Sequence, residues 1–426
     1  MYSGSQKFSS SFLVLLLFVS SIVVITEQTA SLHLPFVTVQ GKFLPSNNVT
    51  GDYWPTDDWR NSTPEAEGMN PSVLNDMLDF IDAEDYPIDS VFIVKNGYVV
   101  FEEHPTGYYG PDSRHEMHSV TKSFASTLIG IALQQGLLDN VSQLLLDFFP
   151  EYTQQNPDPR WNEITIEHLL TMSAGFEWDE STLPYTDPNV NDIGGMIASD
   201  DAVQFVLDKP MLYTPGEHWH YSGGVSLLLG AIIEQIYDRG TRRFADDFLF
   251  DPLGIDSVSW FAMPGGWLNT YGGALRVRPR DMAKLGYLYL NNGTWNDTQI
   301  LPADYVQNAT YPHFTNLPFP PDFTGYGWQW WLLRDLETFA ALGRAGQKII
   351  VSREHDMITV FTASVPDNAY DPEFDLYFDY IIESIGTFEP NPLTDSMVMI
   401  GVLVGVIAVP IVAAAIYFSR KISSRT

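Results

Sequence analysis

The pattern of apolar residues in the first part of the body predicts two strands and a buried helix. Residues 90–94 and 98–102 are short apolar runs on either side of Asn96-Gly97, a pair that strongly favours a tight hairpin between antiparallel strands. Residues 119–138 then form a nearly continuous apolar stretch of helical length. A helix that is apolar on most sides is buried unless it lies in a membrane, so we expect this one at the centre of the domain.

The remainder of the body first reads as helical and then returns to strands. Between residues 147 and 321, helical patches are separated by loops rich in Pro and Gly. Three apolar runs and a final helix follow, at residues 338–342, 348–351, 357–361 and 372–385. Strands from both ends of a domain should pair into one antiparallel sheet flanked by helices, with the mainly helical insert beside it. We therefore expect an α/β (α+β) fold.

Two long apolar segments lie at the ends of the chain. The first follows Lys7 and has the length of a signal-peptide core. Residues 1–30 are thus predicted to be a signal peptide or, because the cleavage site at Ala30 is poor, an uncleaved signal anchor. The second, residues 397–418, carries no charge and is long enough to cross a hydrocarbon layer of about 30 Å as a helix. The alternative, two core helices, lacks the polar stripe that a soluble domain leaves on its helices.

These ends predict where the chain resides. Residues 391–396 form a short linker before the predicted transmembrane helix, and residues 419–426 form a basic tail. Because basic flanks remain cytoplasmic, we expect a cell-membrane protein with a single C-terminal span and an extracytoplasmic body. Such an exported chain fits six Asn-x-Ser/Thr triplets, at Asn48, Asn61, Asn140, Asn292, Asn296 and Asn308.

The composition excludes several classes of function. A formal charge of −31 would repel phosphates, so we expect no nucleic acid partner. The chain has no cysteine, which rules out disulfides, thiolate nucleophiles and cysteine-bound zinc or iron-sulfur centres. His218 and His220 lack a matching carboxylate or third histidine nearby, so we predict no metal and no cofactor.

Ser119 and Lys122 are the candidates for nucleophilic chemistry. A step of three residues brings both side chains to one helix face, where the amine can reach the hydroxyl. Burial among apolar groups disfavours a charged amine, and a neutral amine can take the serine proton. The start of a helix also favours the negative charge that develops when a serine attacks a carbonyl. The alternative, an N-cap serine before a surface lysine, conflicts with the apolar residues 124–133 that follow.

Further motifs follow in order along the chain. They read HSVTKSF (118–124), IEHLLTMSAG (166–175), PGE (215–217), YSG (221–223), DPLG (251–254), RDMAKLG (280–286), YGW (326–328) and ALGRAGQ (341–347). Together they resemble the signatures of the class C β-lactamase-related serine hydrolases, in the superfamily of β-lactamases and penicillin-binding proteins. The resemblance covers about residues 54–385. It implies a β-lactamase/transpeptidase-like fold in a serine hydrolase domain over residues 31–390.

The resemblance also implies a role for each residue of a site. Ser119 would be the acylated nucleophile and Lys122 its hydrogen-bonded activator. Tyr221 would pass the proton to the leaving group, which a phenol beside an ammonium can do more readily than an isolated one. The oxyanion hole would consist of the backbone N–H groups of Ser119 and Arg344, with Gly343 leaving room for the substrate.

Two of the family's motifs differ in this sequence, and the differences restrict the expected substrate. The family's Tyr-x-Asn element ends here in Gly223, so the amide that would hold a substrate carbonyl is missing. The element that usually starts with Lys or His starts with Ala341, so only Arg344 could partly supply a cation for a penicillin-type carboxylate. Both departures resemble the branch that contains 6-aminohexanoate-dimer hydrolase and related esterases. We therefore predict hydrolysis of a small-molecule or peptide-like ester or amide. The alternatives are a penicillin-binding or D-Ala-directed peptidase or β-lactamase, and a non-catalytic ligand-binding ectodomain.

Overall fold

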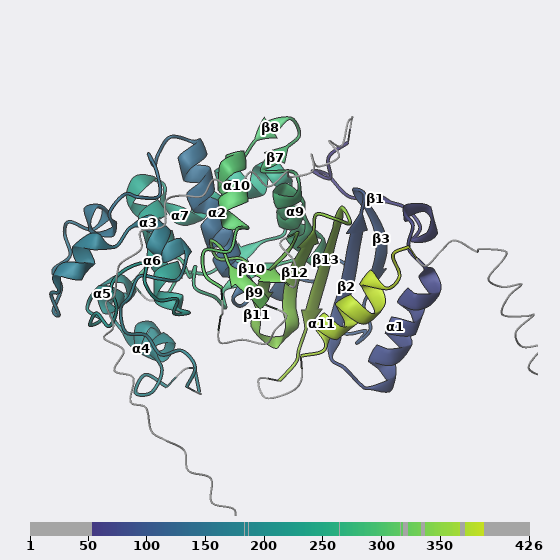
Figure 1. The fold of residues 1–426 in the computed structure, drawn as a ribbon, viewed down its shortest axis with the longest axis horizontal. Coiled ribbons are helices and arrows are strands. Elements are labelled where there is room, and N and C mark those ends of the chain that lie inside the picture. The colour runs from purple at the N-terminus through teal and green to yellow at the C-terminus, as the bar shows by residue number, and fades with distance from the viewer. Residues whose placement is uncertain are drawn as a thin grey trace, which may run out of the picture. The chain divides into compact units, whose positions relative to one another are not determined.

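An eight-stranded sheet brings together strands from both ends of the described chain (Figure 1). The computed structural model describes residues 53–386 except 183, 186, 264, 316, 318–322, 334–336 and 367–370. The strand order is β1-β3-β2-β13-β12-β11-β10-β9, and its pairs are antiparallel except β1 with β3. The strands are β1 (Arg60–Asn61), β2 (Ile88–Lys95), β3 (Tyr98–Glu103), β9 (Phe323–Tyr326), β10 (Trp331–Leu333), β11 (Thr338–Gly343), β12 (Gln347–Ser352) and β13 (Met357–Ala363).

The central pairing of this sheet joins β2, near the start, to β13, near the end. Phe92 lies opposite Val360 in their antiparallel register. The predicted hairpin connects β2 to β3 through Asn96 and Gly97, whose φ angles of 52° and 78° are both positive, as a tight two-residue turn requires. The prediction of one antiparallel sheet assembled from both ends is confirmed.

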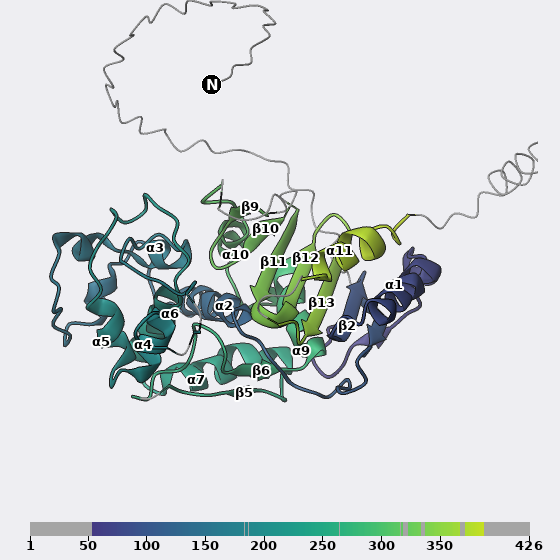
Figure 2. The same ribbon diagram turned by 90° about the horizontal axis from the view of Figure 1, so that it is seen from below.

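Helices cover both faces of the sheet (Figure 2). Successive residues of a strand point to opposite faces. Ile350 of β12 accordingly belongs to a core with Leu74 and Leu376, whereas Ile349 belongs to a second, larger core. The first core lies beneath α1 (Pro71–Ala83), α11 (Glu373–Asp375) and the π-helical η6 (Leu376–Ile382), and the second beneath α2 (Val120–Gln134) and α9 (Pro279–Leu290).

The middle of the chain forms the predicted, mainly helical insert. Its α- and π-helical elements are α3 (Ile166–Leu170), α4 (Asp192–Ala198), α5 (Ala202–Leu207), α6 (Gly223–Ile236), α7 (Gly240–Ala245), the π-helical η4 (Asp246–Phe250), α8 (Asp251–Leu253) and α10 (Ala303–Ala309). Helix α2 contacts α6 on one side and β11 on another. The apolar helix predicted at the domain centre is therefore enclosed between the insert and the sheet.

Five short strands within the middle of the chain were not predicted. They form a three-stranded sheet and a hairpin, from β4 (His115–Glu116), β5 (Ser259–Trp260), β6 (Leu275–Val277), β7 (Thr294–Trp295) and β8 (Thr298–Gln299). Strands of two or three residues are too short for an alternating apolar pattern to show in the sequence.

The predicted membrane attachment needs a correction. Within the part of the chain that the structure describes, no helix has both the length and the apolar character that a bilayer crossing demands. The longest of these helices, α2, has 15 residues, and a span needs about 20. This finding contradicts the C-terminal transmembrane helix and the cell-membrane location with a single span. Residues 397–418 lie outside the described residues, as do the predicted signal segment 1–30, the linker 391–396 and the tail 419–426.

Candidate active site

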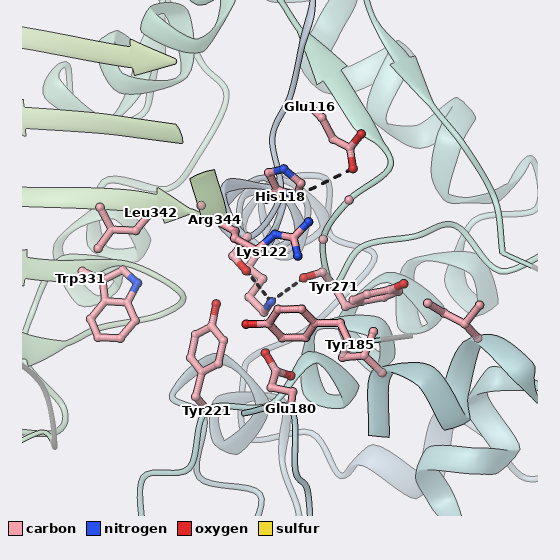
Figure 3. Close-up of a pocket in the computed structure, with 16 residues that line it drawn as sticks. Glu116, His118, Lys122, Glu180, Tyr185, Tyr221, Tyr271, Trp331, Leu342 and Arg344 are labelled. Carbon is pink, nitrogen blue, oxygen red and sulfur yellow. Dashed lines mark hydrogen bonds and ion pairs between the residues drawn. The ribbon is translucent and has the colours of Figure 1, made fainter. Parts of the chain in front are cut away.

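A cavity of about 500 Å³ contains the residues predicted to act on the substrate (Figure 3). It draws side chains from the start of α2, the end of β11 and the helical insert. The residues that line it are Glu116, His118, Ser119, Lys122, Glu180, Tyr185, Ile193, Ile197, Tyr221, Tyr271, Gly272, Gly273, Trp331, Leu342, Gly343 and Arg344. This volume suits a small-molecule ligand.

Ser119 stands at the N-terminal end of α2 with its hydroxyl free of backbone capping. It occupies the N-cap position, yet its side chain accepts no cap hydrogen bond. Its Oγ instead accepts a hydrogen bond of 3.1 Å from Nζ of Lys122. The preceding residue, His118, has a φ of 45°, and such a left-handed backbone costs a non-glycine residue on the order of 1–3 kcal/mol. The backbone turn therefore directs the Ser119 side chain into the cavity.

Lys122 is buried, with 3% of its surface exposed. Besides Ser119, its Nζ donates a hydrogen bond of 2.5 Å to the backbone oxygen of Tyr271. The same Nζ lies 4.8 Å from the centroid of the Tyr221 ring, within the range of a cation–π contact. The one-turn spacing on α2 thus places the amine between the hydroxyl of Ser119 and the phenol of Tyr221.

Tyr221 reaches the cavity from the residues just before α6. The hydroxyl of Tyr221 points toward Lys122 in Figure 3. The rings of Trp219 and Trp331 lie 6.1 Å and 6.0 Å from the Tyr221 ring, centroid to centroid. Among the described residues, the Tyr221 hydroxyl makes no hydrogen bond to Ser119 or Lys122. The aromatic neighbours fix the plane of the phenol and leave its oxygen facing the cavity.

Gly343 lets the end of β11 pack against the start of α2. A Cβ on Gly343 would lie 2.4 Å from the backbone oxygen of Met117 and 3.3 Å from the backbone nitrogen of Ser119. The sequence predicted room for a substrate here, and the structure adds that the chain's own backbone needs this space. The close approach places Arg344, the next residue, beside the main chain of Ser119. Its guanidinium lies 5.2 Å from the centroid of the Tyr185 ring.

The comparisons with known proteins identify the family to which the chain belongs. Residues 78–380 match the protein family described as Beta-lactamase. The chain belongs to the β-lactamase family. Its fold and its family relatives make it a serine hydrolase, and the predicted resemblance is confirmed.

Individual members of the β-lactamase family are distant from this chain. The 6-aminohexanoate-dimer hydrolase of Paenarthrobacter ureafaciens is 21% identical over 290 residues, which cover 65% of this chain and 72% of that protein. A Bacillus anthracis structure provisionally named as a 6-aminohexanoate-dimer hydrolase gives a TM-score of 0.61 at 20% identity, covering 72% of this chain and 80% of the other. EstCE1, a hydrolase with promiscuous acyltransferase activity, gives 0.60 at 15% identity, covering 76% and 100%.

The two departures from the family motifs can now be located. Ala341 is fully buried and is absent from the cavity lining, so the cation that the family places there has no counterpart at this position. Gly223 is the first residue of α6. Its backbone N–H donates to Oε2 of Glu180, a residue that the sequence did not single out. Glu180 lies 58 residues beyond Lys122 in the chain, in the insert, and no motif marks it.

The two histidines weighed as metal ligands lie apart from this chemistry. His218 packs against the ring of Tyr213, with 4.3 Å between centroids, and neither His218 nor His220 lines the cavity. The described residues contain no group of three or more His, Asp or Glu side chains arranged to hold a metal ion. His118, next to the nucleophile, lies 3.7 Å from Oε1 of Glu116.

Proposed function

We propose that the protein hydrolyses ester or amide bonds of small molecules or short peptide-like compounds through an acyl-enzyme on Ser119. The observation that carries this proposal is the 3.1 Å contact between Ser119 Oγ and Lys122 Nζ in the cavity that also holds Tyr221. A serine hydroxyl becomes a competent nucleophile when a neighbouring base can take its proton.

Lys122 and Tyr221 would act as the acid–base pair. The amine of Lys122, which also donates a hydrogen bond to the Tyr271 carbonyl, lies within reach of the Ser119 proton. The serine oxygen then bonds to the substrate carbonyl carbon, its proton passes to the amine, and the carbonyl electron pair moves to oxygen. The N–H groups of Ser119 and Arg344 would stabilise this oxyanion. Collapse restores the carbonyl as the leaving group departs with a proton supplied through Tyr221.

The second half of the cycle consumes one water molecule. Its oxygen attacks the acyl carbon, and its proton passes to the acid–base pair. The bond to Ser119 breaks, the serine oxygen regains a proton, and a carboxylic acid is released. Substrate atoms and protons therefore balance without a cofactor.

The cavity favours esters and simple amides over antibiotic-type substrates. Penicillins and D-Ala-ended peptides carry a carboxylate, and the family's cationic position is here the buried, apolar Ala341. Arg344 also lines the cavity and could supply a cation for such a carboxylate. Acylation by a fluorescent penicillin would therefore support the penicillin-binding alternative. The non-catalytic alternative does not fit a serine hydrolase, and turnover that disappears in a Ser119→Ala protein would eliminate it.

The proposal is tested by labelling the full-length protein with a fluorophosphonate and mapping the modified peptide by mass spectrometry. We expect one adduct on Ser119, and none on a folded Ser119→Ala variant. A panel of acyl esters, short amides and nitrocefin, assayed on both proteins, then defines the bond that is cleaved. Labelling elsewhere, or equal turnover by both proteins, would overturn the proposal.

A further inference from the structure

The carboxylate of Glu180 lies beside Gly223, the position at which the family's side-chain amide is missing. A Cβ on Gly223 would lie 2.6 Å from Cδ1 of Ile193 and 3.0 Å from Oε2 of Glu180. The 2.6 Å separation is shorter than real Cβ contacts, so the end of the Ile193 side chain would have to move to admit a larger residue. The cavity therefore presents a carboxylate beside the position from which the family's asparagine side chain would extend.

Two N–H groups hold the Glu180 carboxylate in place. Nε1 of Trp178 donates to Oε2 at 2.7 Å, and the backbone N–H of Gly223 donates to the same oxygen. Trp178 is itself buried and packs tightly on α6, because a Cβ on Gly224 would lie 2.8 Å from its ring. The start of α6 also favours a negative charge. The position of the carboxylate is thus set by a rigid part of the fold.

The second carboxylate oxygen is available to a ligand. Glu180 lines the cavity, and Figure 3 shows its carboxylate facing the space beside Lys122 and Tyr221. Within the described ranges, Oε1 of Glu180 accepts no hydrogen bond, and Glu180 makes no ion pair with Lys122 or another cation within 4.0 Å. By contrast, Glu116, the other acid in the lining, pairs with Arg276 at 3.0 Å.

A carboxylate lines this cavity and the family's side-chain amide is absent, which changes the ligand groups that the cavity can bind. A side-chain amide both donates and accepts hydrogen bonds, whereas an ionised carboxylate only accepts them and attracts cations. We propose that Glu180 determines specificity by favouring esters and amides whose acyl group carries a primary ammonium close to the scissile carbonyl. A carboxylate at the same position of the substrate would be repelled. This inference rests on the proposed hydrolase function and names the substrate class of that same site.

Three p-nitrophenyl esters of similar size test the assignment on the full-length protein. They are the 3-aminopropanoate, which carries an ammonium, the butanoate, which is neutral, and the monosuccinate, which carries a carboxylate. Turnover by Ser119→Ala is subtracted as background. We expect kcat/KM to fall in the order ammonium, neutral, carboxylate. In Glu180→Gln, the ratio of the ammonium ester to the butanoate should drop by about 10-fold or more, the range for a hydrogen bond to a charged group.

A matched control removes a charge from the same segment outside the cavity. Glu177 is exposed and does not line the cavity, so Glu177→Gln should leave the ratio unchanged. Glu180→Gln retains an oxygen that can accept from Trp178 and Gly223. If this variant still fails to fold, the test is the order of kcat/KM for the three esters with the wild-type protein. A preference for the monosuccinate would overturn the inference.

The outcomes separate this inference from the function on which it rests. Ser119-dependent turnover with a ratio that Glu180→Gln leaves within about twofold would overturn the specificity assignment alone. An absence of Ser119-dependent turnover for all three esters would count against the proposed function, and the inference would fall with it.

Discussion

Nζ of Lys122 lies 4.8 Å from the centroid of the Tyr221 ring and makes no hydrogen bond to the Tyr221 hydroxyl. The phenol therefore has two separable parts, a ring that contacts the amine and an oxygen that faces the cavity. A structural role would depend on the ring, and a proton-transfer role on the oxygen.

Tyr221→Phe separates these two roles because it removes only the oxygen. We expect kcat/KM for an ester to fall by about 100-fold or more, the usual contribution of a general acid or base, with little change in thermal unfolding. Tyr108→Phe removes the hydroxyl of an exposed tyrosine outside the cavity and should behave as wild type. Activity of Tyr221→Phe within about threefold of wild type would exclude the acid–base role.

Gly343→Ala should lower the stability of the fold and disturb the backbone around Ser119. Gly343 has a φ of −133°, which alanine adopts readily, so the effect is steric. The added Cβ would lie 2.4 Å from the backbone oxygen of Met117, which cannot rotate away. We expect unfolding in urea to show a loss of about 1–3 kcal/mol and fluorophosphonate labelling of Ser119 to slow.

The control for this change is Gly110→Ala. A Cβ there would meet no atom within 4 Å, so neither stability nor labelling should change. Wild-type labelling by Gly343→Ala would show that the close approach of β11 does not shape the site.

His115 should make the fold sensitive to acid. Burial, reinforced by the charge of His104, lowers the pKa of His115 from 6.5 to about 4. In the unfolded chain a histidine takes up its proton near pH 6.5, whereas in the folded protein it remains neutral until about pH 4. Between these values the unfolded state binds the extra proton, so the free energy of unfolding falls as the pH is lowered through this window.

The His115→Gln variant tests this dependence by urea unfolding at several pH values. We expect the decline in the free energy of unfolding between pH 6.5 and 4 to shrink by up to about 3 kcal/mol relative to wild type. Identical pH slopes for both proteins would show that His115 is not the group responsible.

A buried ion pair on β12, the strand next to β11, should make the protein sensitive to substitution of Lys348. Nζ of Lys348 lies 3.2 Å from Oε2 of Glu373 and 2.7 Å from Asp371. Glu373 is fully buried. Lys348→Met would leave this carboxylate without its partner, and we expect a loss of about 3–5 kcal/mol in unfolding free energy. The double variant Lys348→Met/Glu373→Gln should recover part of that loss, whereas additive losses would rule out the coupling.

Local signals in the sequence were sufficient for most of the sheet and for the helix that begins after Ser119. The turn at Asn96-Gly97 depends on two neighbouring residues that tolerate positive φ, and the strands after residue 338 are apolar runs of ordinary length. Ser119 and Lys122 could be paired because the helical repeat alone brings them together. Tyr221 and Arg344 were predicted from the family resemblance, because no local pattern connects them to Ser119.

Glu180 escaped prediction because its position depends on tertiary contacts. It reaches the cavity through the N–H groups of Trp178 and Gly223, and the only trace in the sequence is an expected asparagine that is absent. The transmembrane prediction used hydropathy and length alone. The described helices contradict it because none combines enough length with enough apolar character.

The packing of the end of β11 against the start of α2 also has a consequence for how the enzyme is made. Ser119 is synthesised 224 residues before Gly343, the difference between 343 and 119. At about 5–20 residues per second, the ribosome needs roughly 10–45 s to add that length. Throughout this interval the nascent chain carries its serine without the strand that flanks it. Hydrolytic activity should therefore begin only after β11 has been synthesised.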